Sequence, residues 1–238
     1  IPPSQEIMKN DFYKYQAQTT SHPLALEVSH AKGCYIYDIK GKKYLDFIAG
    51  VSASSLGHCH PKVISAVKNQ LDKYLHVMVY GEFIQEPAVE LTKLLSGLLP
   101  DNLTTTYLTN SGTEAIEGSM KLARRATGRK EIIYSKKAYH GNTMGALSIM
   151  GVEERKKIFQ PLLPNCNSIE FNNEKDILKI TSKTAGVVLE TIQGGAGFIV
   201  PKNDYLKKIK NRCSKVGALL ILDEIQPGFG RTGKLFSF

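Results

Sequence analysis

Residues 185–223 read AGVVLETIQGGAGFIVPKNDYLKKIKNRCSKVGALLILD, and this stretch decides the fold class. Its two apolar runs, 185–190 and 218–223, have the length of buried strands, and the apolar residues of 204–216 between them have helical spacing. Two such strands joined through a helix pair in parallel by a right-handed crossover. The stretch therefore predicts an α/β protein whose mainly parallel sheet is covered by helices on both faces.

The same alternation extends toward the N-terminus. It predicts strands at 104–109 (TTTYLT) and 131–135 (EIIYS), with a helix between them at 113–127. Helices are also predicted after Pro61 and after Pro87, where apolar residues recur every three to four positions.

A different pattern occurs near the N-terminus. Residues 33–48 read GCYIYDIKGKKYLDFI and predict a hairpin of two short strands that turns at 38–42. Residues 165–183 show no clear periodicity, so no element is predicted there.

Composition limits the class of protein. The 238 residues are 42% hydrophobic and 22% charged, which is typical of a globular chain. No apolar run approaches the roughly 18 residues of a membrane span. No secretion leader is recognisable, although a start at Ile1 is compatible with a trimmed N-terminus. We therefore expect a protein that is not bound to a membrane.

Charge and cysteine content restrict the partners and the compartment. The net charge is +9, but the lysines of 202–215 lie along a predicted helix and do not alternate with aromatic residues. We therefore expect no nucleic-acid partner. The four cysteines show no close pairing, which favours reduced thiols in the cytoplasm.

Polar residues at two predicted strand ends suggest chemistry, because ligands of open α/β sheets gather there. After 104–109, the first turn of the next helix offers free backbone N–H groups beside Ser111 and Thr113. These residues either bind a phosphate or only cap the helix. Asp223 ends a strand that is apolar on both faces, so its carboxylate needs a partner. That partner is a cofactor, an arginine of this chain or a magnesium ion.

Three further segments carry candidate residues. Tyr139 follows the strand at 131–135 and either stacks on a planar ligand or packs as an ordinary tyrosine. Residues 228–235 (GFGRTGKL) match GxGxxG and nearly match a nucleotide-binding loop, but Leu235 replaces the metal-binding hydroxyl, so we expect an accidental match. In the segment 57–61, at most His58 and His60 could bind the same metal ion. A turn before a helix start at Pro61 is the preferred interpretation, and no metal site is predicted.

Four motifs taken together resemble one family. NSGTEA (110–115), YHGNT (139–143), ETIQGGAG (190–197) and DEIQPGFGRTGK (223–234) occur in this order in the chain. They resemble the class III (ω-amino acid) aminotransferases, which have the fold-type-I architecture and depend on pyridoxal 5′-phosphate. The resemblance implies transfer of an amino group from an amino acid or ω-amine to a 2-oxo acid by a homodimer.

The resemblance assigns the cofactor's phosphate and ring. Ser111, Gly112 and Thr113 would hold the phosphate. Tyr139 would stack on the pyridine ring and Asp223 would bind the ring nitrogen. A buried carboxylate there would keep the pyridinium protonated and able to withdraw electrons from the substrate.

Four more residues would line the cofactor pocket on the same resemblance. His140 would lie beside the stacked tyrosine, and Ile225 would pack on the other face of the ring. Gln226 would donate a hydrogen bond to the phenolic oxygen, and Glu190 matches a glutamate close to the pocket.

The substrate side of the pocket departs from well-known members of the family. Asn142 stands where ornithine, acetylornithine and 4-aminobutyrate aminotransferases usually have an arginine that binds a substrate carboxylate. Gly195 stands where they usually have a glutamate that screens this arginine. These changes favour a broader ω-amine or β-amino-acid aminotransferase. Tyr80 is the second candidate substrate contact, with Asn142.

The resemblance also predicts how the chain is divided. It places residues 1–55 in a segment that contributes to a small domain, and 56–238 in the large domain that binds pyridoxal phosphate. The family's Schiff-base lysine lies beyond the next strand after the GFGRTG motif, and no lysine before Phe238 matches it. We therefore expect no catalytic residue in this chain, which corresponds to the N-terminal half of such an enzyme. The alternative is a chain that binds the cofactor or dimerises without turnover.

Overall fold

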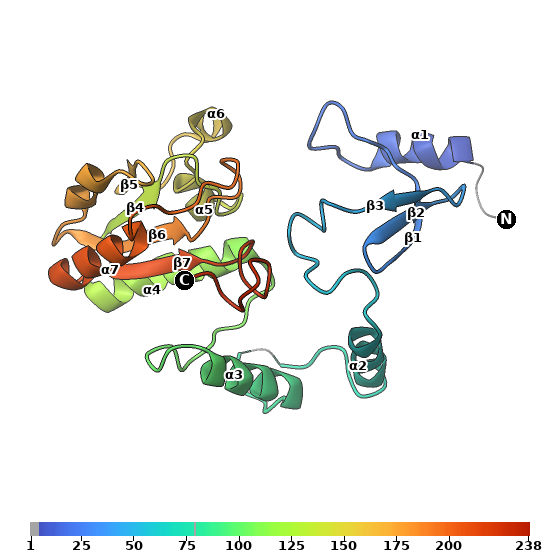
Figure 1. Cartoon of the computed structure of the whole chain (residues 1–238), viewed down its shortest axis with the longest axis horizontal. Coiled ribbons are helices and arrows are strands. Elements are labelled where there is room, and N and C mark those ends of the chain that lie inside the picture. Colours follow the sequence, from blue (N-terminus) through green and yellow to red (C-terminus); the bar gives the residue numbers. More distant parts are fainter. Residues whose placement is uncertain (1–4, 79) are drawn as a thin grey trace. The chain divides into compact units, whose positions relative to one another are not determined.

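The computed structural model describes residues 5–78 and 80–238, which divide between Val77 and Met78 into two compact units (Figure 1). The predicted boundary between residues 55 and 56 stays a prediction, because this division does not test which residues belong to a small domain. No helix among the described residues has the length and apolarity needed to cross a bilayer.

The first unit contains a three-stranded antiparallel sheet in the order β1-β2-β3. The hairpin predicted within 33–48 is confirmed by β2 and β3, whereas β1 was not predicted. Asp38 orders the turn, because its Oδ1 accepts hydrogen bonds from the backbone N–H groups of Lys40 (2.9 Å) and Lys42 (2.8 Å). The elements of this unit are α1 (Gln5–Tyr15), β1 (Val28–Lys32), β2 (Tyr35–Asp38), β3 (Lys43–Leu45) and α2 (Pro61–Leu71).

The second unit is built on a four-stranded sheet in the order β5-β4-β6-β7, and all its strand pairs are parallel. The two strands predicted from 185–223 are β6 and β7 of this sheet, and the predicted crossover helix between them is α7. Its helices are α3 (Glu86–Leu98), α4 (Gly112–Thr127), α5 (Met144–Ser148), α6 (Glu153–Lys156), η1 (Lys157–Phe159), η2 (Glu174–Lys179) and α7 (Tyr205–Val216). Its strands are β4 (Glu131–Ser135), β5 (Cys166–Ile169), β6 (Thr184–Glu190) and β7 (Leu219–Asp223).

Two hydrophobic clusters cover opposite faces of this sheet. On one face Ile132 of β4 packs with Ile116 and Met120 of α4. On the other face Ile133 of β4 packs with Ile209 of α7. Successive strand residues point to opposite faces, so a strand buried on both sides needs apolar residues in succession, as in the middle of EIIYS and in AGVVL. The predicted α/β architecture with helices on both faces is confirmed.

Two parts of the sequence-based assignment need correction. Residues 104–109 were predicted as a strand but form none, and Tyr107 within them is 82% exposed. A strand is stable only beside a partner strand, and no described strand pairs with this segment. Conversely, the sequence did not predict β5 at Cys166–Ile169, because CNSI lacks the alternation of a strand. This segment is a strand because it pairs in parallel with β4.

Candidate functional site

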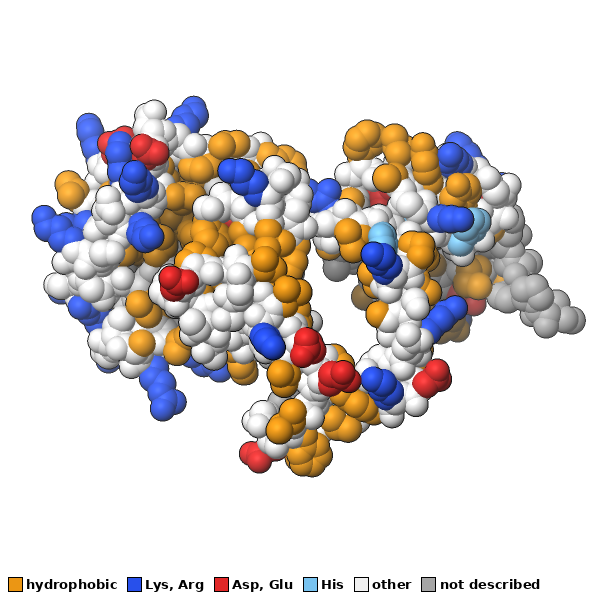
Figure 2. Space-filling view, turned by 60° about the horizontal axis from the view of Figure 1, so that its bottom comes forward, with side chains coloured by type: hydrophobic (Ala, Val, Ile, Leu, Met, Phe, Trp, Pro, Cys, Tyr) orange, Lys and Arg blue, Asp and Glu red, His pale blue; other side chains and the backbone are white. Residues whose placement is uncertain are grey.

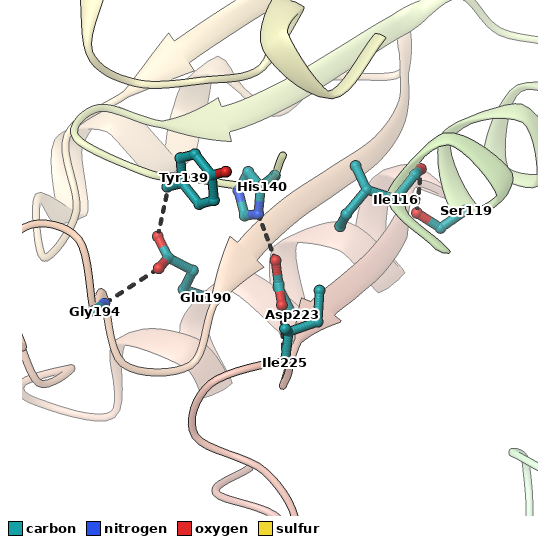
Figure 3. A network of polar contacts seen from close by, with 8 residues as sticks. All are labelled: Ile116, Ser119, Tyr139, His140, Glu190, Gly194, Asp223 and Ile225. Atoms are coloured by element: carbon teal, nitrogen blue, oxygen red, sulfur yellow. Dashed lines mark hydrogen bonds and ion pairs between the residues drawn. The ribbon is translucent and has the colours of Figure 1, made fainter. Parts of the chain in front are cut away.

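Three loops that leave the same edge of the sheet carry most of the predicted site residues. Tyr139 and His140 follow β4, Glu190 ends β6 and Asp223 ends β7 (Figure 3). β6 and β7 pair in register, with Glu190 opposite Asp223. In a parallel sheet the carboxyl ends of all strands meet at one edge. The topology therefore brings together side chains that are far apart in the sequence.

A buried histidine–carboxylate pair lies at the centre of this edge. His140 Nδ1 is 2.7 Å from Asp223 Oδ2, and the two side chains are 0% and 5% exposed. The backbone N–H of Ile225 donates to the other carboxylate oxygen at 3.0 Å. The partner that Asp223 requires within the chain is therefore this histidine and not an arginine. His140 Nε2 is buried and has no hydrogen-bond partner among the described residues.

Glu190 joins two of the strand-end loops. Its carboxylate accepts hydrogen bonds from the backbone N–H groups of Tyr139 (3.3 Å) and Gly194 (3.2 Å) (Figure 3). Burial raises the pKa of this carboxyl above its ordinary value, while the nearby His140 acts in the opposite direction. Glu190 thus holds the loop after β4 against the loop after β6.

The N-terminus of α4 supplies unpaired donors. Ser111 caps the helix, because its Oγ accepts a hydrogen bond from the backbone N–H of Glu114 at 3.3 Å, and Glu114 Oε2 accepts from the N–H of Asn110 at 2.9 Å. The capping role is therefore confirmed. The backbone N–H groups of Gly112 and Thr113 have no acceptor within the described part of the chain. They remain available to an anion, whereas the single proton of the Ser111 hydroxyl is donated to Glu114 Oε2 at 3.3 Å.

The start of α4 lies against the loops after β4 and β7. Thr113 Oγ1 is 2.7 Å from Thr143 Oγ1 in the loop after β4. A β-carbon at Gly112 would lie only 2.7 Å from Cδ1 of Ile225, so the start of α4 and the Ile225 side chain are in close contact. A β-carbon at Gly194 would likewise overlap the Gln226 side chain. The structure therefore places the predicted phosphate donors next to the residues predicted to contact the ring.

Other predicted residues lie at the surface of this edge. The Tyr139 ring lies beside His140, and Ile225 lies beside Asp223 (Figure 3). Tyr139 and Ile225 are exposed, as is Asn142 in the loop after β4. Tyr80 is 85% exposed, and no hydrogen bond joins it to the other candidates. Among the predicted site residues, all of which the structure describes, only Tyr80 lies neither at the start of α4 nor at the end of β6 or β7 or in the loops that follow β4, β6 and β7.

Two alternative sites receive no support. A nucleotide-binding loop must open a helix, whereas residues 225–234 after β7 form turns and bends, so this segment gives no structural support for nucleotide binding. His58 Nε2 is 2.8 Å from Asp46 Oδ2, and α2 begins at Pro61 as expected. No cluster of three or more potential metal ligands is found in residues 5–78 and 80–238.

Sequence reasoning missed one residue that organises this edge. The Glu117 carboxylate, one turn after Thr113 on α4, accepts hydrogen bonds from Thr143 Oγ1 and from two backbone N–H groups at the start of α5. Its spacing of four residues from Thr113 places it on the same helix face, and that spacing was the available signal.

Comparison with known proteins identifies related sequences. The family model described as aminotransferase class-III matches residues 15–238. The chain is 42% identical over 214 residues to an acetylornithine aminotransferase of Clostridium acetobutylicum, covering 87% of this chain and 54% of that protein. It is 44% identical over 213 residues to a putative LysW-aminoadipate semialdehyde/glutamate semialdehyde transaminase of Pyrococcus abyssi, covering 89% and 57%. The chain thus spans slightly more than half the length of these relatives.

Solved structures give the same result for the fold. The chain superposes on the adenosylmethionine-8-amino-7-oxononanoate aminotransferase of Methanocaldococcus jannaschii with a TM-score of 0.90 at 30% identity, covering 97% of this chain and 57% of that one. The TM-score against the ornithine aminotransferase of Toxoplasma gondii is 0.84 at 31% identity, with coverages of 98% and 56%. An amine transaminase of an uncultivated Pseudomonas species, solved with pyridoxal phosphate bound, matches with a TM-score of 0.81 at 25% identity, with coverages of 92% and 59%.

Proposed function

Because the chain belongs to the class III aminotransferases, whose family model matches residues 15–238, we propose that it binds pyridoxal phosphate in an amino-group-transferring enzyme. The proposed reaction moves the amino group of an amino acid or ω-amine to a 2-oxo acid. One observation carries the proposal. A buried carboxylate, an aromatic ring and two free N–H groups at a helix N-terminus meet at one edge of the sheet.

The chemistry of these groups fits the cofactor. The free N–H groups of Gly112 and Thr113 suit its phosphate, and the buried carboxylate of Asp223 suits a protonated ring nitrogen. The exposed side chains of Tyr139 and Ile225 are apolar enough to cover the two faces of a ring. When bound, the cofactor supplies an electron-withdrawing ring that makes the proton of the substrate's α-carbon easier to remove.

The remaining candidates act on these groups. His140 orients the Asp223 carboxylate from Nδ1 and separates it from solvent. Glu190 fixes the backbone of Tyr139, and so the position from which its ring would stack. Gln226 would donate to the phenolic oxygen. The Ser111 hydroxyl, which donates to Glu114 Oε2, would turn its proton to the phosphate. These roles keep charge and orientation fixed before a substrate binds.

Two observations bear on the substrate, and they favour different donors. The curated relatives include acetylornithine aminotransferases, whereas Asn142 and Gly195 leave this chain without the charged pair expected in that subgroup. A β-carbon at Gly195 would lie 3.6 Å from Cβ of Tyr139, an ordinary contact, so crowding does not exclude a glutamate. We propose a donor without a second carboxylate to bind there, such as an ω-amine or a β-amino acid.

Amino transfer is the direct test of the proposed function. The protein expressed from its complete reading frame and loaded with cofactor should move ¹⁵N from a labelled donor to a 2-oxo acid, as followed by mass spectrometry. The Asn142→Arg/Gly195→Glu variant should shift the preference from ω-amines toward N-acetylornithine. Cofactor binding without ¹⁵N transfer would favour the alternative, a chain that binds pyridoxal phosphate or dimerises without turnover.

Cofactor attachment gives a second test. On the resemblance, no lysine of the 238 residues matches the family's Schiff-base lysine, so we expect this chain to bind the cofactor reversibly and to be inactive alone. Borohydride reduction followed by peptide mapping should yield no stoichiometric adduct on one lysine. A single such adduct accompanied by turnover would refute this expectation.

We also propose that the enzyme is a homodimer in the cytoplasm. All four cysteines are free, which agrees with a reducing compartment. Neither α2 nor α3 buries a residue completely, and both present apolar side chains at helical spacing. Apolar surfaces of this kind are typical of association sites.

A further inference from the structure

The contacts of Glu117 extend the proposed phosphate site beyond its first turn. Glu117 Oε1 accepts hydrogen bonds from Thr143 Oγ1 (2.6 Å), Gly145 N–H (2.8 Å) and Ala146 N–H (3.2 Å). Gly145 and Ala146 begin α5, so this carboxylate satisfies two N–H groups that lack partners within that helix. One side chain of α4 therefore holds the loop that carries Tyr139 and His140.

The donors and acceptors in this cluster fix the direction of its hydrogen bonds. A carboxylate has no proton to give, so the Thr143 hydroxyl must donate to Glu117. The Thr143 oxygen then acts as the acceptor in its 2.7 Å contact with Thr113. The Thr113 hydroxyl proton is thereby directed toward Thr143. Thr113 keeps its free backbone N–H for an anion.

We infer that Glu117 is a positioning residue of the cofactor site, acting through Thr143 to hold the 139–146 loop against the start of α4. The inference rests on the proposed function, because it assumes that this edge binds pyridoxal phosphate. The direction in which removal of Glu117 changes the affinity for the cofactor distinguishes positioning from electrostatics. A carboxylate near a phosphate repels it, so an electrostatic effect alone would make removal of Glu117 strengthen binding. A positioning role predicts weaker binding instead.

Binding of 4′-deoxypyridoxine 5′-phosphate tests the inference. This probe keeps the ring and the phosphate but has no aldehyde that reacts with surface lysines. Isothermal titration should show at least about tenfold weaker binding for Glu117→Ala. Glu117→Gln should bind nearly as tightly as the wild type, because its amide oxygen still accepts from Thr143. A loss in the Ala variant with recovery in the Gln variant identifies the acceptor, and not the charge, as the feature that matters.

Glu114 provides the matched control on the same helix. Glu114→Gln removes one negative charge from the same helix end, while its amide oxygen still accepts from the N–H of Asn110 and from the Ser111 hydroxyl. The affinity of Glu114→Gln for the probe should equal or exceed that of the wild type. The inference is overturned if Glu117→Ala binds within twofold of the wild type, or if both Glu117 variants bind more tightly as Glu114→Gln would.

A second pair of variants covers the case in which Glu117→Ala does not fold. Thr143→Val removes the hydroxyl link and leaves Glu117 at the start of α5, and it should weaken binding of the probe severalfold. Thr143→Ser keeps the hydroxyl and should bind like the wild type. Tighter binding by Thr143→Val would also overturn the inference. Absence of binding by the wild type would instead refute the proposed function.

Discussion

At the scale of single residues, the His140–Asp223 pair shows what local sequence reveals and what it cannot. The need for a partner follows from the sequence, because Asp223 ends a strand that is apolar on both faces. The identity of that partner does not follow, since His140 lies 83 positions earlier and only the order of strands in the sheet brings it within 2.7 Å. The capping by Ser111 follows from local sequence, whereas the contact of Thr113 with Thr143 depends on tertiary packing.

Glu190 carries a prediction about stability and pH. Burial raises its folded-state pKa above its ordinary value of 4.5, so the folded protein binds this proton more tightly than the unfolded chain does. Its contribution to stability is therefore greatest below pH 4.5 and declines as the pH rises through the folded-state pKa. Glu190→Gln cannot ionise and should gain stability relative to the wild type between pH 4 and pH 8.

Denaturant unfolding at the two pH values measures this difference. Glu154→Gln is the control, because Glu154 is an exposed residue in the same unit. If the wild type instead gains stability relative to Glu190→Gln as the pH rises, the burial argument for Glu190 is wrong.

At the scale of secondary structure, the helices and strands with strong patterns were predictable and the weakly patterned ones were not. EIIYS and the run at 185–190 form strands because both faces are buried, and this apolar character is visible in the sequence. CNSI becomes a strand only by pairing with β4. TTTYLT has strand-forming residues but no described partner, so its composition alone was misleading.

Arg129, in the loop between α4 and β4, joins β6 to α7 and allows a test at this scale. Its Nη1 donates to the carbonyl oxygens of Thr184 (3.0 Å), Val216 (2.9 Å) and Gly217 (2.9 Å), at the start of β6 and the end of α7. Arg129→Ala should lower the free energy of unfolding by about 2 kcal/mol, because hydrogen bonds from a charged donor are lost. The exposed Arg125→Ala should change it by about 0.5 kcal/mol or less. Equal effects in chemical denaturation would show that these carbonyl contacts contribute nothing.

At the scale of the whole molecule, uncovered apolar surface is the main feature that the fold leaves unexplained. Hydrophobic side chains are exposed over both units in Figure 2. In α3, Leu91, Leu94 and Leu98 are exposed at spacings of three and four, so they share one helix face. A second copy of the chain in the proposed homodimer would cover such a face.

Sedimentation velocity tests this assembly in the complete protein. The wild type should sediment as a dimer, and Leu94→Glu should shift it toward monomer because it places a charge on the apolar face of α3. Lys93→Glu introduces the same group at the neighbouring exposed position and should leave the dimer intact. A monomeric wild type with full transaminase activity would contradict the proposal.

The central claim is that this sheet edge holds the ring of pyridoxal phosphate with its nitrogen at Asp223. The most direct measurement is the ¹⁵N NMR shift of ring-labelled 4′-deoxypyridoxine 5′-phosphate bound to the protein. The pH is chosen so that the free probe's ring nitrogen has lost its proton. Bound to the wild type, the nitrogen should still give a protonated signal, because the Asp223 carboxylate stabilises the pyridinium.

Asp223→Asn keeps the side-chain volume and removes this charge. The bound probe should then give the signal of a neutral pyridine, while its phosphate-anchored affinity changes far less. In the complete enzyme the same variant should slow removal of the substrate's α-proton by orders of magnitude. A protonated signal that persists in Asp223→Asn, or an unprotonated one in the wild type, would contradict the assignment of Asp223 and with it the proposed site.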